Sequence, residues 1–259
     1  MDLELSGKVA IVTGASRGIG AAIAQRLAAE GMRLVLAARD AAALDQIAAM
    51  LPASATPLVV AADLRPPEAP ARVVTQTLSA FSRIDLLVNN AGATQRGDFL
   101  ALTDDQWQDG FALKFFAAMR LSRAAWTHLA TSRGSIVNIA GIGGRTGEAE
   151  FTIGGSVNAA ILNLTKSLAH RGATDGVRVN AINPGLIRTD RLMRRIAAFA
   201  QNHQTSPEDA ATRMAARFGV ARFGEVHEIA DTVAFLASSR SAYTHGAVID
   251  IDGGATRTL

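Results

Sequence analysis

The sequence predicts an α/β protein built on one doubly wound parallel sheet. Short apolar runs alternate along the chain with longer amphipathic ones, which is typical of repeated βα units. Most of the short runs are continuous Val, Ile, Leu and Ala stretches, as expected for strands buried on both faces. No repeat or linker divides the chain, so we expect residues 1–259 to form a single domain.

Seven short apolar runs are the predicted strands, and right-handed crossovers between them place helices on both faces of the sheet. The strands are Lys8–Thr13, Arg33–Ala38, Pro57–Ala61, Ile84–Asn89, Ser135–Ala140, Arg178–Asn183 and Ala247–Ile251. The predicted helices are Gly18–Glu30, Ala41–Met50, Pro66–Ser82, Asp104–Thr131, Phe151–Arg171 and Glu225–Ser238. Residues 190–224 have a helical pattern, and we expect them to form a flap over the carboxyl edge of the sheet.

Composition excludes several classes of protein. The chain is 49% hydrophobic, which suffices for a sizeable core, and it has no cysteine for disulfides, thiolate catalysis or thiolate metal sites. We therefore expect no metal site. The net charge is only +3 and the basic residues are scattered, which argues against binding to nucleic acid. No apolar run approaches the roughly 20 residues that span a bilayer, and we expect a cytoplasmic protein without membrane contact.

A glycine-rich turn follows the first strand and leads directly into a helix, in the order Thr13-Gly14-Ala15-Ser16-Arg17-Gly18-Ile19-Gly20. Glycine permits the tight turn and the close approach of a pyrophosphate, and the helix N-terminus offers free N–H groups to the phosphates. A plain tight turn is the alternative. The position of the turn at the start of a βαβ unit favours a dinucleotide site.

Five ordered motifs resemble those of the short-chain dehydrogenase/reductase family, and together they cover essentially the whole chain. They are Thr13–Gly20, Asp63-Leu64, Asn89-Asn90-Ala91-Gly92, Asn183-Pro184-Gly185-Leu186-Ile187-Arg188-Thr189 and Ile249-Asp250-Ile251-Asp252-Gly253-Gly254. The resemblance implies a Rossmann fold and a nicotinamide cofactor. It also implies that Asp63 and Leu64 flank the adenine, and that Ile187 and Thr189 hold the nicotinamide carboxamide. The cofactor-binding residues expected on this basis are Gly14, Ser16, Arg17, Gly18, Ile19, Gly20, Arg39, Asp63, Leu64, Asn90, Ala91, Gly92, Pro184, Gly185, Ile187 and Thr189.

The end of the second strand favours NADP(H) over NAD(H). In proteins that bind NAD, an acidic residue usually ends this strand and accepts hydrogen bonds from the ribose 2′-hydroxyl. Here Ala38 takes that place, and Arg39 and Arg17 offer fork-shaped donors to a 2′-phosphate. Two solvated surface arginines are the alternative.

The catalytic residues of the family are absent from their expected positions. The family uses a serine after the fifth strand, Tyr-x-x-x-Lys in the next long helix, and an asparagine in the preceding helix. The run Ala159–Ala169 matches the family after the lysine, which places Asn158 at the lysine position and Gly154 at the tyrosine position. The serine position falls at Ala140 or Gly141, and the asparagine position at Lys114. The one tyrosine, Tyr243, is far from this helix in sequence.

Loss of the tyrosine removes the usual proton donor, and a well-placed general acid contributes about 10²–10⁴-fold in rate. We expect Gly154 to leave a void the size of a phenol beside the nicotinamide. Lys114 either acts as proton donor through a lowered pKa, or faces solvent or binds a backbone carbonyl at a helix kink. Asn158 is expected to hydrogen-bond the nicotinamide ribose.

These features predict a divergent NADP(H)-dependent oxidoreductase that transfers hydride to or from a small carbonyl or alcohol, with Lys114 and Asn158 in the active site. A catalytically silent NADP(H) sensor or partner subunit is the alternative, and a scaffold without nucleotide is a third. The resemblance also implies a homodimer or homotetramer. The flap arginines Arg191, Arg194 and Arg195 attract an acidic substrate or, as we favour, form a solvated helix face.

Overall fold

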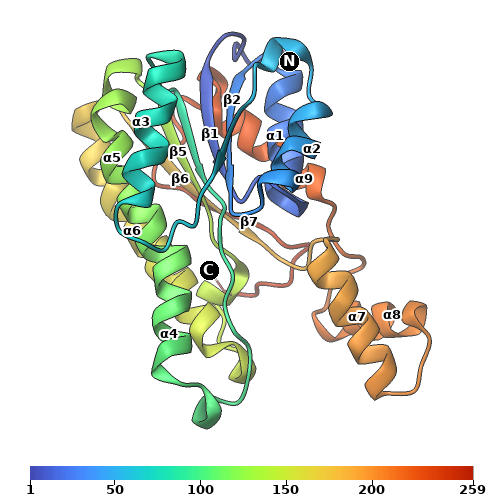
Figure 1. The fold of residues 1–259 in the computed structure, drawn as a ribbon. Helices are drawn as coiled ribbons and strands as arrows, with labels where there is room; N and C mark the ends of the chain where they lie inside the picture. Colours follow the sequence, from blue (N-terminus) through green and yellow to red (C-terminus); the bar gives the residue numbers. More distant parts are fainter. Residues whose placement is uncertain (259) are drawn as a thin grey trace.

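A computed structural model describes residues 1–258 and contains one parallel sheet of seven strands (Figure 1). The strands lie in the order β3-β2-β1-β4-β5-β6-β7, so the chain reverses its direction of winding between β1 and β4. Their bounds are β1 Val9–Thr13, β2 Arg33–Ala38, β3 Leu58–Ala61, β4 Leu86–Asn89, β5 Ser135–Ile139, β6 Arg178–Pro184 and β7 Val248–Ile251. The predicted doubly wound α/β fold is therefore confirmed.

Helices cover both faces of the sheet. One face carries α1 (Gly18–Ala29), α2 (Ala41–Ala49) and α9 (Val226–Ala237), and the other carries α3 (Ala69–Phe81), α5 (Ala117–Ser132) and α6 (Thr152–Asp175) (Figure 1). Successive side chains of a strand point to opposite faces. In β1, Ala10 and Val12 accordingly pack in the first layer while Ile11 packs in the second.

The predicted helix Asp104–Thr131 is interrupted in the structure. It consists of α4 (Asp104–Gly110), a π-helical turn η3 (Phe111–Phe116) and α5. A π-helical turn adds one residue between hydrogen-bonded groups without changing the local composition, so apolar spacing alone does not reveal it. The turn is important for the site because it contains Lys114.

The predicted flap is a pair of helices, α7 (Asp190–Asn202) and α8 (Pro207–Arg217), that projects from the carboxyl end of the sheet (Figure 1). It has a small core of its own, which includes Leu192, Ile196 and Met214. None of the helices in the described part of the chain has the length and hydropathy of a membrane span.

Helix α1 packs closely against the glycine-rich turn, and a substitution at Gly20 tests this packing. A Cβ atom at Gly20 would lie 2.1 Å from the Gly14 carbonyl oxygen, which is backbone and cannot move aside cheaply. Overpacking costs about 1–3 kcal/mol, and each kcal/mol lowers the Tm of a domain of this size by roughly 2–4 °C. We expect Gly20→Ala to lower the Tm by several degrees in a thermal melt.

The matched control is Gly147→Ala, because a Cβ atom there would have no neighbour within 4 Å. Equal melting temperatures for the two variants would contradict the packing described for α1.

Candidate cofactor cleft and active site

Hydrogen bonds join the turns after β1 and β4 at the carboxyl edge of the sheet. The Asn90 side-chain amide donates to the Thr13 carbonyl at 2.9 Å and to the Gly14 carbonyl at 3.3 Å. The Thr13 hydroxyl accepts from the backbone N–H groups of Asn90 and Ala91 at 2.9 and 3.0 Å. These bonds hold the cleft at the point where the strand order reverses, which is where open α/β sheets bind their ligands.

The N-terminus of α1 is open to an anion. In the described chain, no side chain caps this helix, because the N-cap residue Arg17 is extended and exposed, and the first turn carries no acid. Its first N–H groups are consequently available to a phosphate. Thr189 forms the opposite wall, since its methyl group would lie 3.3 Å from a Cβ atom at Gly18. Along the same wall, Pro184 and Ile187 are buried and Gly185 is half-buried.

The end of β2 offers a cation and no competing carboxylate from its own turn. Arg39 is exposed directly after the strand. The next residue, Asp40, caps α2 by accepting a hydrogen bond from the backbone N–H of Ala43 at 3.1 Å. The Asp40 carboxylate is therefore engaged in the fold, which leaves the ribose side of the cleft to Arg39.

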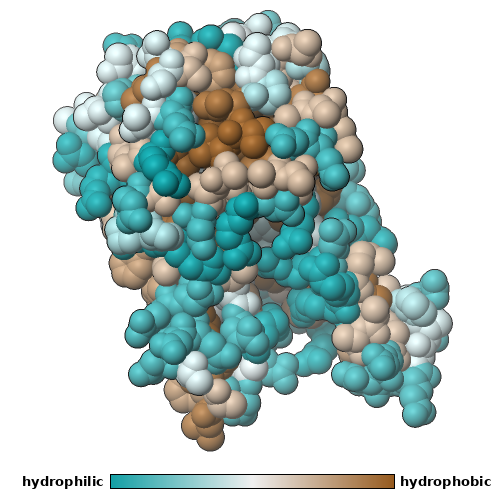
Figure 2. All heavy atoms as spheres, viewed as in Figure 1, coloured by the Kyte–Doolittle hydropathy of each residue, from teal (hydrophilic) through white to brown (hydrophobic). Residues whose placement is uncertain are grey.

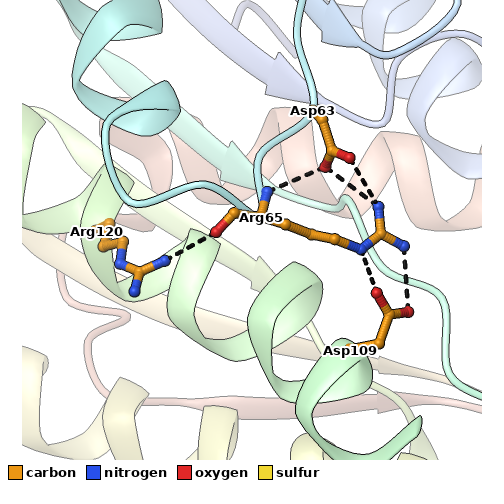
Figure 3. Close-up of polar contacts among 4 residues, drawn as sticks. All are labelled: Asp63, Arg65, Asp109 and Arg120. Carbon is orange, nitrogen blue, oxygen red and sulfur yellow. Dashed lines mark hydrogen bonds and ion pairs between the residues drawn. The ribbon is translucent and has the colours of Figure 1, made fainter. Parts of the chain in front are cut away.

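The loop after β3 is tied to the helices by Arg65 (Figure 3). Its guanidinium donates to both Asp63 oxygens at 3.2 Å and pairs with Asp109 of α4 through two hydrogen bonds. Arg120 of α5 donates to the Arg65 carbonyl at 3.1 Å. The hydrogen bond to Asp109 is the main cause that raises the pKa of Arg65. Asp63, expected beside the adenine, is thus held at the cleft with part of its carboxylate exposed, while Leu64 is buried.

Lys114 is a half-buried cation that faces the carboxyl edge of the sheet. Its ammonium donates to the Ala140 carbonyl at 2.8 Å and to Asn158 Oδ1 at 2.6 Å. Its side chain runs so close to Gly92 that a Cβ atom there would lie 2.8 Å from Lys114 Cδ. Burial, and secondarily the charge of Arg191, lower the pKa of Lys114 to about 7. The lysine therefore binds a backbone carbonyl beside a helix irregularity and has an accessible proton near neutral pH.

The void expected at Gly154 does not exist, and that prediction is wrong. A Cβ atom at Gly154 would lie 2.1 Å from ring atoms of Phe151, so the phenyl ring fills this space. Gly143 leaves room for the other edge of the ring, which would lie 2.9 Å from a Cβ atom there. The guanidinium of Arg96 stacks over the ring at 4.4 Å. The only tyrosine, Tyr243, is fully exposed in the segment before β7.

Asn158 lies against the loop after β5. Its side chain is only 2% exposed, and its amide nitrogen would lie 3.0 Å from a Cβ atom at Gly141. Because Oδ1 accepts from Lys114, this amide orients the ammonium. A contact with the nicotinamide ribose stays a prediction. The structure therefore brings Lys114, Asn158, Gly141 and Gly154 together, as expected from the sequence, and adds Phe151.

Three residues important to this arrangement were not expected from the sequence. Phe151 precedes its helix and carries no catalytic motif, and Arg65 and Asp109 are separated by 44 residues. Arg65 binds two carboxylates from different segments, Asp63 and Asp109. Such a pairing has no local sequence pattern, so only the fold reveals it.

The fold and the glycine-rich turn are those of dinucleotide-binding α/β proteins, and comparisons with known proteins identify the family. A family described as enoyl-(acyl carrier protein) reductase matches residues 14–256. Meso-2,3-butanediol dehydrogenase of Serratia marcescens is 32% identical over 257 residues, covering 98% of this chain and 96% of its own. The 3-oxoacyl-(acyl-carrier-protein) reductase of Escherichia coli is 32% identical over 253 residues, with coverage of 97% and 98%.

A solved structure is also similar along the entire chain. L-sorbose reductase of Gluconobacter frateurii, described in complex with NADPH and L-sorbose, superposes with a TM-score of 0.95 at 34% identity and covers 100% of both chains. The chain belongs to the short-chain dehydrogenase/reductase family of oxidoreductases, and the resemblance of its motifs is confirmed.

The lowered pKa of Lys114 is directly testable. An amine acylates only when it is neutral, so brief labelling with acetic anhydride across pH 5–10 should follow deprotonation of each lysine. We expect labelling of Lys114, measured by peptide mass spectrometry, to reach half of its plateau at about pH 7. The exposed Lys166 on α6 reports reagent activity at each pH. A Lys114 profile that still rises steeply above pH 9 would show that burial does not lower this pKa.

Proposed function

We propose that this chain is a divergent NADP(H)-dependent oxidoreductase that interconverts a small carbonyl compound and its alcohol, with Lys114 as the proton donor. The observation that carries the proposal is the Lys114 ammonium, held by two hydrogen bonds at the catalytic edge of the sheet with a pKa of about 7. A general acid works best when its pKa lies near the working pH.

The cleft fits a phosphorylated dinucleotide. The uncapped α1 N-terminus would hold the pyrophosphate, and Arg17 and Arg39 would hold the 2′-phosphate. Asp63 and Leu64 would flank the adenine, and Ile187 and Thr189 would hold the carboxamide. When bound, the cofactor supplies or accepts the hydride at the carbonyl carbon. The NADPH bound by the similar L-sorbose reductase supports the preference for NADP(H).

Lys114 would move the proton that accompanies the hydride. In the direction of reduction, the ammonium would donate one proton to the carbonyl oxygen, which becomes the hydroxyl group of the alcohol. Lys114 is then a neutral amine and regains a proton from solvent, as a pKa of about 7 permits. Asn158 and the Ala140 carbonyl position the amine throughout.

We further propose that Gly154 and Asn158 stand where the family has its tyrosine and lysine, and that Gly141 stands at the serine position. The contacts support this alignment. Phe151 occupies the space beside Gly154, and Asn158 lies in the same helix four residues on, in contact with Lys114. One amine on the facing helix would thus combine the proton donor with the positive charge that stabilises a developing oxyanion.

A second function is favoured by one observation. The Phe151 ring fills the space beside Gly154, so an apolar group stands where a polar catalytic side chain would contact the expected nicotinamide. This is also what a cofactor sensor or a silent partner subunit requires. Such a protein binds NADP(H) saturably but transfers no hydride.

A small-molecule substrate and a homo-oligomer complete the proposal. A shallow apolar groove lies along α4 and η3, lined by Trp107, Gln108, Phe111, Ala112 and Phe116. Its apolar character supports a homodimer or homotetramer in which this face is covered.

Removal of the Lys114 amine tests the chemistry. We expect Lys114→Ala to lower NADPH-dependent turnover by at least about 10²-fold, the contribution of a general acid, while NADPH affinity changes by no more than a few-fold. Turnover is followed as NADPH consumption across ketones, ketoses and 3-oxoacyl thioesters. Lys166→Ala removes the same side chain from the exposed side of α6 and should retain wild-type rates.

Unaltered turnover in Lys114→Ala would remove the lysine from the mechanism. Saturable NADPH binding by wild-type protein, without consumption on any substrate, would instead establish the silent function.

A binding titration tests the cofactor. We expect wild-type protein to bind NADPH more tightly than NADH, because Arg17 and Arg39 carry charges that a 2′-phosphate satisfies. Loss of one charge-assisted contact in Arg39→Ala should weaken NADPH by about tenfold and leave NADH nearly unchanged. Arg213→Ala, on the exposed face of α8, is the matched control. Equal affinity of the wild type for both cofactors would contradict the preference.

A further inference from the structure

Two arginines of the flap lie near the carboxyl edge of the sheet, beside the proposed active site. Arg191 and Arg195 are one helical turn apart in α7 and therefore lie on the same side of the helix. Arg191 donates a hydrogen bond across the cleft to the Gly92 carbonyl at 3.1 Å, and Arg195 is half-buried. The sequence favoured a solvated helix face. Arg191 and Arg194 are exposed, as that interpretation expects, whereas Arg195 is half-buried.

The charge of this pair is poorly balanced. In residues 1–258, neither arginine has a carboxylate within ion-pair distance. Burial lowers the pKa of Arg191, and the charges of Arg17 and Arg194 lower it further. Burial also lowers the pKa of Arg195. Arg96 adds to that effect, and Glu148 opposes it. Since Glu148 is itself paired with Arg96, positive charge remains in excess.

The pair lies between the parts of the proposed active site. Electrostatic repulsion from Arg191 helps to lower the pKa of Lys114. Arg195 is close enough to Arg96 for their charges to repel, and Arg96 stacks on the Phe151 ring beside Gly154. The inner side of α7 thus faces the space where a substrate carbonyl would meet the Lys114 ammonium. Figure 2 shows mostly hydrophilic residues around the opening between the α7–α8 flap and the rest of the molecule.

We infer that the substrate carries an oxyanion, a carboxylate or a phosphate, that Arg195 binds together with Arg191. Two guanidinium groups close enough to repel each other are stabilised by an anion between them, and their planar forks match carboxylate and phosphate oxygens. Arg191 also neighbours Arg17, which is proposed to hold the 2′-phosphate of the cofactor, so Arg191 lies at the boundary between cofactor and substrate. Arg195 is one turn farther along α7 and is the specificity residue. This inference rests on the proposed function.

The test compares two pairs of probes that differ in the anion. The pairs are acetoacetate with its methyl ester, and fructose 6-phosphate with fructose, so that the first measures a carboxylate and the second a phosphate. Binding to the NADP⁺-loaded protein is measured by titration calorimetry at constant ionic strength, and turnover is measured with NADPH. We expect at least one anionic member to bind about tenfold or more tightly than its neutral partner, the effect of one charged contact.

Variants locate the anion. Arg195→Gln should reduce the ratio of anionic to neutral affinity by about tenfold, and Arg195→Lys should restore part of it because the charge is kept. Arg213→Gln removes the same charge from the exposed face of α8 and should leave the ratio as in the wild type. Thermal melts verify that each variant is folded.

The two proposals fail in different ways. Preferential binding of an anion that depends on Arg195, without NADPH consumption, would support the anion site and reject catalysis. NADPH consumption on neutral carbonyls, with neither anion preferred, would reject the anion site and leave the oxidoreductase standing. An anion preference that is unchanged in Arg195→Gln would also overturn the inference.

Discussion

The hydrogen bonds between Thr13 and Asn90 are the constraint on which the site depends. They fix the turn after β1 against the turn after β4, at the point where the strand order reverses. In a parallel sheet all strands end at the same edge, so this position also fixes the loop after β5 and the segment after β6. The positions of helix α1, Lys114 and the flap all depend on that edge.

An aromatic ring and a cation without an ionic partner in residues 1–258 both lie near this edge. Phe151 brings an apolar ring to the position beside Gly154, and Lys114 brings a cation whose hydrogen-bond partners, Ala140 and Asn158, are both neutral. An ammonium held this way gains no ion-pair energy, and its charged form is therefore the one that burial disfavours. The same desolvation that makes Lys114 costly to bury makes its proton available near neutral pH.

The fold, and the glycine-rich turn at its carboxyl edge, could be predicted from the sequence because their determinants are local. Buried strands are short apolar runs, and the glycine-rich turn lies between consecutive elements. The surroundings of Lys114 could be predicted only in part. Lys114 and Asn158 were placed by counting from a motif, but the π-helical turn at Phe111–Phe116 leaves no trace in the spacing of apolar residues.

Other features depend on residues that the chain brings together from a distance. Entry of the Phe151 ring requires glycine at both 143 and 154, in two separate segments. The bridge from Asp63 through Arg65 to Asp109 joins a loop to a helix 44 residues away. The positions of Arg191 and Arg195 depend on how α7 is placed at the carboxyl edge of the sheet. None of these has a sequence pattern of its own.

The Phe151 ring also limits which side chains position 154 can accept. Any larger residue at position 154 would begin with a Cβ atom 2.1 Å from that ring, so it requires the ring to move. Removing the phenylalanine first would open a cavity in the wall of the cleft and cost stability. The residues at positions 151 and 154 are therefore coupled, because the size of one side chain sets the space open to the other.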